Sequence, residues 1–380
     1  MKTNERILVI LAAMIIIVGF TASGATAAGR LVSDMNLYKP PLAVGTANRD
    51  LAVPQGNKVH QVVKSAEGKY EIQTISLIDP GVPYLSGKAE LTMNFVQQVL
   101  LYRNRLYVLG GYNASHFIQV VHVGDVVPKL GGVVSALTDA KSMAICRGWL
   151  GVIGDDKLQL FNLDKPDKPK LKETYREAQG GFTDIEMKGL RAYVLIHVPG
   201  QQSRITVYAI SEYREVEKLV SAPVGPFVSN LALLDEFNNG FLLAMGTEEP
   251  KLYETYLSSR PKLEVKAYFE AFAIDNDGRL RPINPPTTSN KEMVVAVASS
   301  EDSGSLYLAV QEWFWSQQQG TYACRPIIKK FDVSSGGFRP SGSAGTGVTY
   351  PVFMQQLGDG LYVYGPDFDG VQRLEVFQIR

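Results

Sequence analysis

The stretch MAICRGWLGVIGDDKLQLFNLDKPDKPKLKETY, from Met143 to Tyr175, contains short apolar segments that are separated by turn residues. Its second apolar segment is the triplet Leu150-Gly151-Val152, which has counterparts elsewhere in the chain, often with tyrosine at the centre. The counterparts are Leu106-Tyr107-Val108, Ala192-Tyr193-Val194, Phe241-Leu242-Leu243, Leu306-Tyr307-Leu308 and Leu361-Tyr362-Val363. Residues Tyr70 to Leu91 match the later half of the same unit, which adds an earlier copy and establishes an internal repeat.

The repeat indicates seven copies, beginning near residues 50, 95, 140, 182, 228, 291 and 348. Four of the intervals lie in the range of about 40–50 residues for a four-stranded propeller blade, and the others leave room for insertions. β-Branched and aromatic residues alternate with polar ones, and no helical stripe follows Ala28. We therefore predict an all-β fold, a single β-propeller of seven four-stranded blades over residues 50–380, with six blades as the alternative.

The ends of the repeat predict how the ring closes. An array of β-sandwiches would need linkers between separate cores, and none is visible, whereas propeller blades cover the faces of their neighbours. The last copy ends at Arg380 after three strands, which leaves an exposed edge. We expect Pro41–Gly45, in the extension formed by residues 28–49, to supply the missing outer strand.

The first 27 residues have the pattern of a secretory signal. Lys2 and Arg6 precede an apolar run from Ile7 to Val18, and Ala25-Thr26-Ala27 fits the small-residue cleavage site. The run is short for a membrane span, which needs about 20 apolar residues, although an uncleaved N-terminal anchor is the alternative. Both interpretations predict that residues 28–380 lie outside the cytoplasm, in the periplasm or secreted.

The composition argues against several classes of function. The 38 Lys and Arg residues balance 38 Asp and Glu residues, so the overall charge gives no reason to expect nucleic acid or anionic lipid as a partner. Two cysteines and four histidines, without metal-ligand spacing, predict no metal site and no cofactor. No nucleophile motif such as G-x-S-x-G occurs, so catalysis is uncertain and the sequence favours a protein that is not an enzyme.

Several strands end in Asp and continue into a turn that contains proline. Asp79-Pro80 with Pro83, and Asp164 with Pro166 and Pro169, follow this pattern, and Gly124-Asp125 with Pro128 follows it in part. Here the chain resembles the LVIVD-repeat family of secreted propellers. The later copies depart from the pattern, since Asn276-Asp277-Gly278 replaces the proline turn. The resemblance implies a propeller fold and an extracytoplasmic location, but no catalytic residues.

Long loops gather on one predicted face of the propeller. They connect second to third strands or successive copies, and they include Thr247–Lys262 and the hairpin Gln311–Pro326. Loops on a rigid scaffold commonly carry recognition, and tryptophan is favoured at interface hot spots. The predicted partner-binding residues are Trp313, Phe314, Trp315, Tyr322, Tyr253, Tyr256 and Tyr112. The alternative for Trp313 and its neighbours is packing between blades.

Two hypotheses of function follow from these observations. The preferred one is a non-catalytic protein-binding or scaffold module of the cell envelope, with a protein or other envelope component as its partner and no membrane insertion apart from an N-terminal anchor. The alternative is a propeller enzyme of the lactonase or hydrolase type, with a metal at the central channel. A cluster of carboxylates and amides converging on that channel would favour the enzyme.

Overall fold

The computed structural model of the chain describes residues 32–38 and 51–379, with short gaps in the second range. The gaps are residues 66, 79–83, 125–126, 200, 212–215, 235–239, 248–250, 254–261, 266, 287–290, 301–303, 319–320, 335–336, 352, 358–359 and 370–371. The predicted signal, residues 1–27, therefore lies outside the described residues. No helix in the described part is long and apolar enough to cross a membrane.

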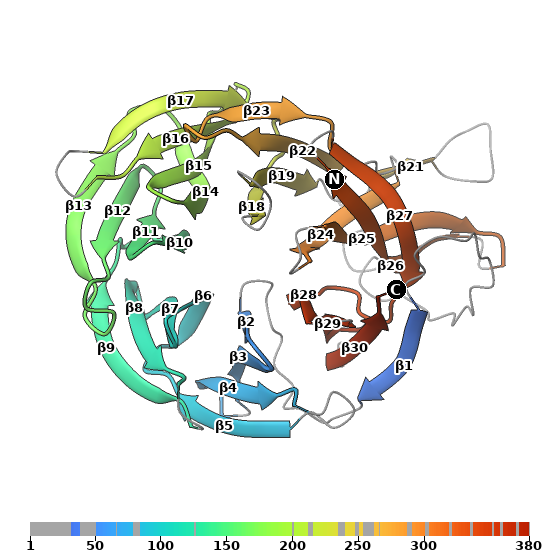
Figure 1. The fold of residues 1–380 in the computed structure, drawn as a ribbon, viewed down its shortest axis with the longest axis horizontal. Coiled ribbons are helices and arrows are strands. Elements are labelled where there is room, and N and C mark those ends of the chain that lie inside the picture. Colours follow the sequence, from blue (N-terminus) through green and yellow to red (C-terminus); the bar gives the residue numbers. More distant parts are fainter. Residues whose placement is uncertain are drawn as a thin grey trace, which may run out of the picture.

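Seven antiparallel sheets surround a central opening, and the chain passes through them in sequence order (Figure 1). Each sheet is a blade whose first strand lies innermost and whose fourth lies at the rim. Blade 1 contains β2 (Ala52–Gln55), β3 (Lys58–Lys64), β4 (Tyr70–Ser76) and β5 (Tyr84–Glu90). Blade 2 contains β6 (Phe95–Tyr102), β7 (Arg105–Tyr112), β8 (Ser115–His122) and β9 (Lys129–Ser135). Blade 3 contains β10 (Ser142–Cys146), β11 (Trp149–Ile153), β12 (Lys157–Asn162) and β13 (Lys170–Arg176).

The later blades carry the insertions. Blade 4 contains β14 (Gly181–Lys188), β15 (Arg191–His197), β16 (Arg204–Ala209) and β17 (Glu217–Pro223). Blade 5 contains β18 (Asn230–Leu234), β19 (Phe241–Thr247), β22 (Ala267–Ile274) and β23 (Leu280–Ile283), with the hairpin β20 (Lys251–Tyr253) and β21 (Lys262–Glu264) inserted after β19. Blade 6 contains β24 (Glu292–Ser299), β25 (Ser305–Ser316), β26 (Thr321–Ser334) and β27 (Gly337–Gly345).

The seventh blade joins the two ends of the chain. It contains β28 (Phe353–Leu357), β29 (Gly360–Pro366), β30 (Gln372–Gln378) and, as its outer strand, β1 (Val32–Tyr38). β1 pairs antiparallel with β30, and Val32 lies opposite Gln378. The segment from which we expected this strand, Pro41–Gly45, lies outside the described residues.

The prediction of seven four-stranded blades is confirmed. The inner strands begin within five residues of the predicted starts, from Ala52 in blade 1 to Phe353 in blade 7. The repeat could be located because each blade has the same succession of short strands and tight turns.

The apolar core consists of seven clusters, one at each interface between neighbouring blades. The cluster between blades 1 and 7 includes Val59 and Ile75 of one blade and Tyr362 and Leu374 of the other. Each sheet thus buries both faces against its neighbours, and the ring closes through apolar packing as well as through β1.

Candidate functional site

The propeller has two faces that differ in their loops. We call the side that carries the turns between second and third strands, together with the connections between blades, the loop face. The opposite side, which carries the first-to-second and third-to-fourth strand turns, is the turn face. Backbone hydrogen bonds support this grouping, because Asn94 in the connection from blade 1 donates to Gly111 at the end of β7 (2.8 Å).

The longest described projection on the loop face is the hairpin of β25 and β26. These strands pair as far as Ser316 and Thr321, whereas the pairing of β24 with β25 ends at Glu312 and that of β26 with β27 ends at Ile327. The outer part of the hairpin, residues 313–325, therefore extends beyond the blade as a two-stranded ribbon (Figure 1). We call this part the blade 6 ribbon.

The ribbon brings four of the predicted aromatic residues together. Trp315 lies opposite Tyr322, and their ring centroids are 5.1 Å apart in an edge-to-face arrangement. Phe314 lies on the other side of the ribbon, where the Arg325 guanidinium sits 5.7 Å from its ring centroid. Glu312 Oε2 accepts a hydrogen bond from Arg325 Nε at 2.5 Å. The guanidinium of Arg325 is therefore positioned by both Phe314 and Glu312. All four aromatic side chains remain partly accessible or half-buried.

Trp313 lies at the base of the ribbon, next to the end of the pairing between β24 and β25. Its backbone N–H donates to the carbonyl of Lys291 at 2.9 Å, and its indole Nε1 is inaccessible to solvent without a hydrogen-bond partner among the described residues. This placement fits the packing interpretation for Trp313. Cys324, directly opposite, has its thiol pKa raised to about 12, mainly by burial, so it is an unreactive thiol.

Two further exposed aromatic residues lie in connections of the loop face and were not predicted from the sequence. Phe227, in the connection from blade 4 to blade 5, is 42% exposed, and its ring centroid lies 5.0 Å from that of Tyr268. Tyr350, in the connection from blade 6 to blade 7, is 58% exposed. Both connections place an aromatic residue next to proline, Pro226 or Pro351, and this pairing is the signal that could have identified them.

The connection that bears Tyr350 is fixed to the base of the hairpin. Gln311 Nε2 donates to the carbonyl of Thr349 at 3.1 Å, and the N–H of Thr346 donates to the carbonyl of Pro326 at 3.1 Å. Tyr350 is therefore held beside the root of the ribbon on a constrained backbone.

The remaining predicted residues lie elsewhere or cannot be placed. Tyr112 is 57% exposed at the turn between β7 and β8, in blade 2, three blades away from blade 6 around the ring. Tyr112 therefore lies on the loop face but away from the blade 6 ribbon. Tyr253 belongs to β20, but its side chain is not described, and Tyr256 lies outside the described residues.

Each third strand has a polar side chain at an equivalent position, and in blades 2, 5 and 7 this side chain accepts hydrogen bonds from the connections of the loop face. The position is the one that lies opposite the fourth residue of the second strand. In blade 2 it is Gln119, whose Oε1 accepts the N–H of Thr92 at 3.1 Å. At the same position Glu270 Oε1 accepts the N–H of Gly225 at 2.6 Å. The seven residues at this position are Gln73, Gln119, Gln159, Thr206, Glu270, Lys329 and Glu375.

The inner strands use their amide and carboxylate groups to join blades. Gln98 Oε1 accepts the N–H of Met143 at 2.6 Å. The two carboxylate oxygens of Asp184 accept from Ser142 Oγ and from the N–H of Leu231, each at 2.8 Å. These groups lie near the channel as the enzyme hypothesis requires, but they are occupied by contacts between strands. Within the described ranges, no three His, Cys, Asp or Glu side chains gather in a metal-binding arrangement.

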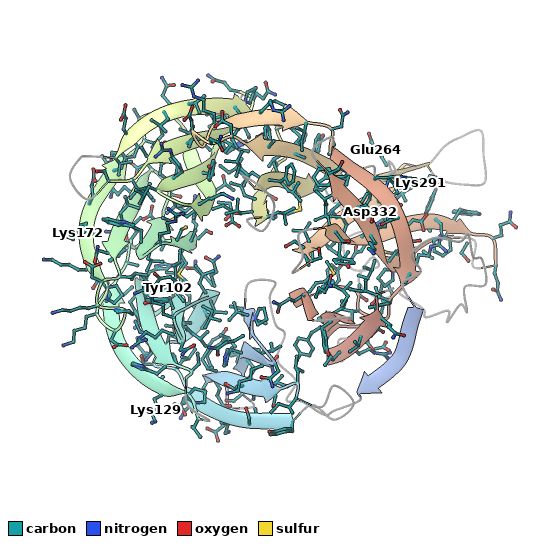
Figure 2. All side chains as sticks on the ribbon, in the orientation of Figure 1. Tyr102, Lys129, Lys172, Glu264, Lys291 and Asp332 are labelled. Carbon is teal, nitrogen blue, oxygen red and sulfur yellow. The ribbon has the colours of Figure 1, made fainter. Side chains whose placement is uncertain are left out.

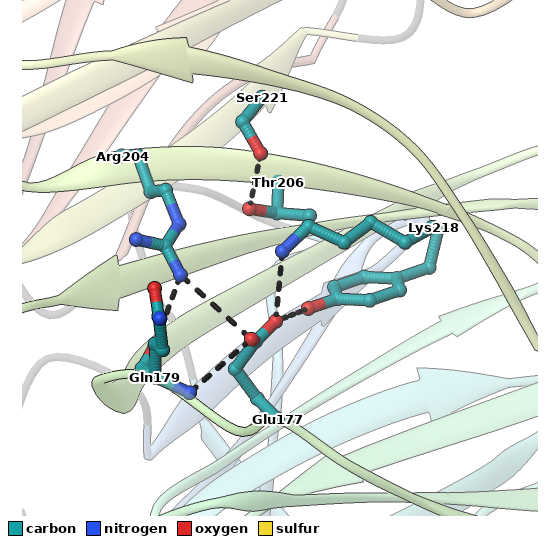
Figure 3. A network of polar contacts seen from close by, with 7 residues as sticks. Glu177, Gln179, Arg204, Thr206, Lys218 and Ser221 are labelled. Carbon is teal, nitrogen blue, oxygen red and sulfur yellow. Dashed lines mark hydrogen bonds and ion pairs between the residues drawn. The ribbon is translucent and has the colours of Figure 1, made fainter.

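A second polar network joins blades 3 and 4 (Figure 3). Glu177, 7% exposed, accepts hydrogen bonds at Oε2 from the Tyr208 hydroxyl at 2.7 Å and from Lys218 Nζ at 3.2 Å. Arg204 Nη2 lies 3.8 Å from Oε1 and donates to the Gln179 carbonyl. Burial alone raises the pKa of Glu177, but the bonds from Tyr208 and Lys218 outweigh it and hold the pKa below its usual value. This carboxylate is charged and fully engaged, which suits a structural link.

On the turn face, the proline turn of blade 3 holds blade 2. Asp167 accepts hydrogen bonds from Arg105, Nε to Oδ1 at 2.5 Å and Nη2 to Oδ2 at 3.0 Å. The Tyr107 hydroxyl donates to the carbonyl of Pro166 at 2.9 Å. The arginine bond is the leading cause that lowers the pKa of Asp167. The Asp-Pro turn pattern therefore has a role in joining blades.

Comparisons with known proteins agree with this fold. No protein-family model and no curated protein matches the chain. A protein from Lactobacillus plantarum has a similar structure, with a TM-score of 0.54 at 12% identity over 84% of this chain and 94% of that one. A protein described as a candidate 6-phosphogluconolactonase from Bacteroides uniformis gives 0.51 at 11% identity, over 79% and 88% of the two chains.

Hsv2 from Kluyveromyces lactis is a further structural neighbour, with a TM-score of 0.51 at 11% identity over 85% of this chain and 95% of that one. At such low identity the likeness concerns the fold alone. The chain is a seven-bladed β-propeller that resembles lactonase-type and Hsv2-type propellers, without assignment to a particular family.

Proposed function

We propose that the chain is a non-catalytic binding propeller that captures a protein partner through its loop face. The observation that carries the proposal is the blade 6 ribbon, which projects from a rigid ring and presents Trp315 and Tyr322, with Tyr350 exposed at its root. Aromatic residues supply much of the binding energy at protein interfaces, and a rigid support limits the entropy lost on binding.

We further propose that the partner is a component of the cell envelope. The supports are the N-terminal pattern of Lys2, Arg6 and the apolar run that ends at a small-residue site, and the Asp-Pro turns that resemble the LVIVD-repeat family of secreted propellers. In this proposal the chain is exported and acts in the periplasm or after secretion.

The test is capture from an extract of the native envelope with the chain from residue 28 onward as bait. The double variant Trp315→Ala with Tyr350→Ala should lower the yield of the captured protein at least about tenfold, because it removes two central aromatic contacts. Tyr84→Ala is the matched control, since Tyr84 is 52% exposed but lies on the turn face.

The outcomes separate the two hypotheses of function. The Tyr84 variant should capture as well as the parent, and circular dichroism of all variants should be unchanged. If the double variant captured as much protein as the parent, the blade 6 ribbon and Tyr350 would not be the partner-binding surface. A metal present in stoichiometric amount in the purified protein, together with hydrolysis of a lactone, would favour the enzyme alternative.

A further inference from the structure

The turn face of blades 1–3 exposes a repeated aliphatic residue that the loop-face proposal does not use. The second residue of each outer strand is leucine, and Leu85, Leu130 and Leu171 are 43%, 42% and 44% exposed. Each follows proline by two positions, in Pro83-Tyr84-Leu85, Pro128-Lys129-Leu130 and Pro169-Lys170-Leu171. Neighbouring blades therefore present the same apolar side chain at the same height of the rim.

The adjoining turns enlarge this apolar surface. Ile78, in the third-to-fourth strand turn of blade 1, is 66% exposed, and Val127 in the corresponding turn of blade 2 is 50% exposed. Tyr84 stands beside Leu85 and is 52% exposed. We call these four residues, together with Leu130 and Leu171, the turn-face patch. Six large apolar residues are thus exposed on one face of three neighbouring blades, and exposed apolar surface of this kind often marks an interaction site.

Positive charge predominates beside the patch in blades 2 and 3. On the turn face of blades 2 and 3 the exposed cationic residues are Arg103, Lys129, Arg147, Lys165 and Lys168, and among the described residues there the exposed carboxylate is Asp164. Asp167 is neutralised by Arg105. Lys170 and Lys172 extend the cationic surface along β13, and Figure 2 shows Lys172 at the outer edge of the ring. The overall charge of zero thus conceals a local excess of cations.

The exposed charges on the same face of blades 5 and 6 are of both signs. Asp275 and Asp277 are exposed at the third-to-fourth strand turn of blade 5 together with Arg279, and Asp332 is exposed at the end of β26 in blade 6 opposite exposed Arg339. Among the described residues, the turn face is consequently cationic over blades 2 and 3, beside the aliphatic residues of blades 1–3. Such a surface favours contact with an anionic plane along one edge of the ring.

The N-terminal strand begins on the same face. Val32 pairs with Gln378 at the end of β30, which is the turn-face end of that strand, in the blade next to blade 1. Val32 follows Ala28 by four positions, a span of at most about 14 Å. The apolar N-terminal segment of the preprotein is therefore joined to the ring on the side of the turn-face patch.

We propose that the turn-face patch docks on an anionic lipid surface, with the aliphatic side chains at the headgroup level and the lysines against the lipid charges. Aliphatic residues beside lysines suit this interface, where lysine stems cover apolar surface and the ammonium groups contact phosphate. The loop face would then point away from the membrane, toward a partner. The proposal concerns a different surface from the protein-binding site and stands independently of it.

The test uses the folded chain from residue 28 onward and sedimentation with phosphatidylcholine vesicles that contain or lack phosphatidylglycerol. Binding is expected with phosphatidylglycerol and should weaken at high salt, because salt screens charges beyond about 10 Å at 0.1 M. Lys165→Ser with Lys168→Ser should lower the affinity by more than tenfold, since each lysine contributes about fivefold near an anionic surface. Leu130→Ser with Leu171→Ser should give a similar loss.

Matched controls separate this surface from the rest of the molecule. Leu219→Ser removes a leucine of comparable exposure, 39%, from the outer strand of blade 4, and Tyr350→Ala alters the loop face; both should bind vesicles like the parent. Thermal unfolding of each variant shows whether the ring is intact. Absence of vesicle binding, equal binding to neutral vesicles, or parental binding by both double variants would overturn the proposal, whatever the result for partner capture.

Discussion

At the scale of single residues, buried polar side chains join neighbouring blades through hydrogen bonds. The Tyr107 hydroxyl donates to the Pro166 carbonyl, and the Tyr193 hydroxyl donates to the Gly278 carbonyl at 3.3 Å, in each case reaching the next blade. These tyrosines are the central residues of the repeated apolar triplets. Their aromatic rings therefore fill the core, while their hydroxyls donate to backbone carbonyls in the turns of the next blade. His60 occupies the corresponding position, the third residue of the second strand, in blade 1.

His60 is expected to make the stability of the ring depend on pH. Its side chain is fully buried, Nδ1 lies 2.9 Å from Thr74 Oγ1, and Nε2 lies 2.7 Å from Gln55 Oε1. Burial, aided by the charge of Lys58, lowers the pKa of His60 to about 4. In the unfolded chain the ordinary value is about 6.5, so below that pH the unfolded chain binds a proton that the folded one does not.

The stabilising effect of neutral His60 is therefore full above pH about 6.5 and is lost as the pH falls toward 4, by a total of about 3 kcal/mol. His60→Gln should remove this part of the slope when the free energy of unfolding is measured by urea titration across that range. An unchanged slope in the variant would show that other groups cause the pH dependence.

At the scale of strands, the polar position in the third strand supports the connections of the loop face in blades 2, 5 and 7. In blade 7, Glu375 Oε1 accepts the N–H of Gly347 at 2.9 Å and Oε2 accepts from the Thr346 hydroxyl at 2.6 Å. In blade 6 the same position is Lys329, which instead pairs with both oxygens of Glu292 at 2.6 Å. In blade 6, the hydrogen-bond acceptor of the third strand is thus replaced by a lysine, which forms an ion pair with Glu292 of the inner strand.

Removal of the acceptor in blade 7 should loosen the connection that carries Tyr350. Glu375→Ala leaves the N–H of Gly347 and the hydroxyl of Thr346 without partners, so we expect a loss of roughly 2 kcal/mol in the free energy of unfolding. Glu375→Gln, which keeps an acceptor oxygen, should lose about half as much. The local measurement is hydrogen exchange of the Gly347 amide, which should be faster in the alanine variant than in the glutamine variant. Equal exchange rates in the two variants would contradict the role of Glu375 as the acceptor for this connection.

The strands were more predictable from the sequence than the site was. Alternation and turn residues repeat in every blade, so the seven inner strands could be located within five residues. Trp313 and Trp315 were identified by residue type, but their positions at the base and in the outer part of the ribbon depend on where β24 ends, and no local pattern encodes that. Phe227 and Tyr350 were missed because each stands alone in a connection between blades.

For the whole molecule, stability depends on closing seven apolar interfaces in a circle. Six of them join blades that are consecutive in the chain, whereas the seventh joins residues near Val59 to residues near Tyr362. Contacts so distant in sequence form late, because a long loop must close first. β1 covers the edge of β30 and completes blade 7, one of the two blades at this last interface.

Deletion of residues 29–38 should leave blade 7 with three strands and lower the melting temperature by several degrees. The expected cause is the loss of the β1–β30 hydrogen bonds and exposure of the β30 edge, which should also promote dimers. A peptide of the sequence Val32–Tyr38 should restore the melting temperature, and a scrambled peptide of the same composition should not. A deletion variant with the parental melting temperature would exclude a stabilising role for β1.

The pairing of Val32 with Gln378 has a mechanical consequence. Because β1 and β30 are antiparallel and their free ends lie side by side, a force that pulls the two termini apart acts on one pair of hydrogen bonds at a time, as in unzipping. Resistance to such a force is lower than if all the bonds were loaded together. Traction on the ends would therefore release the outer strand first, and the circle of blades would open at the seam between blades 7 and 1.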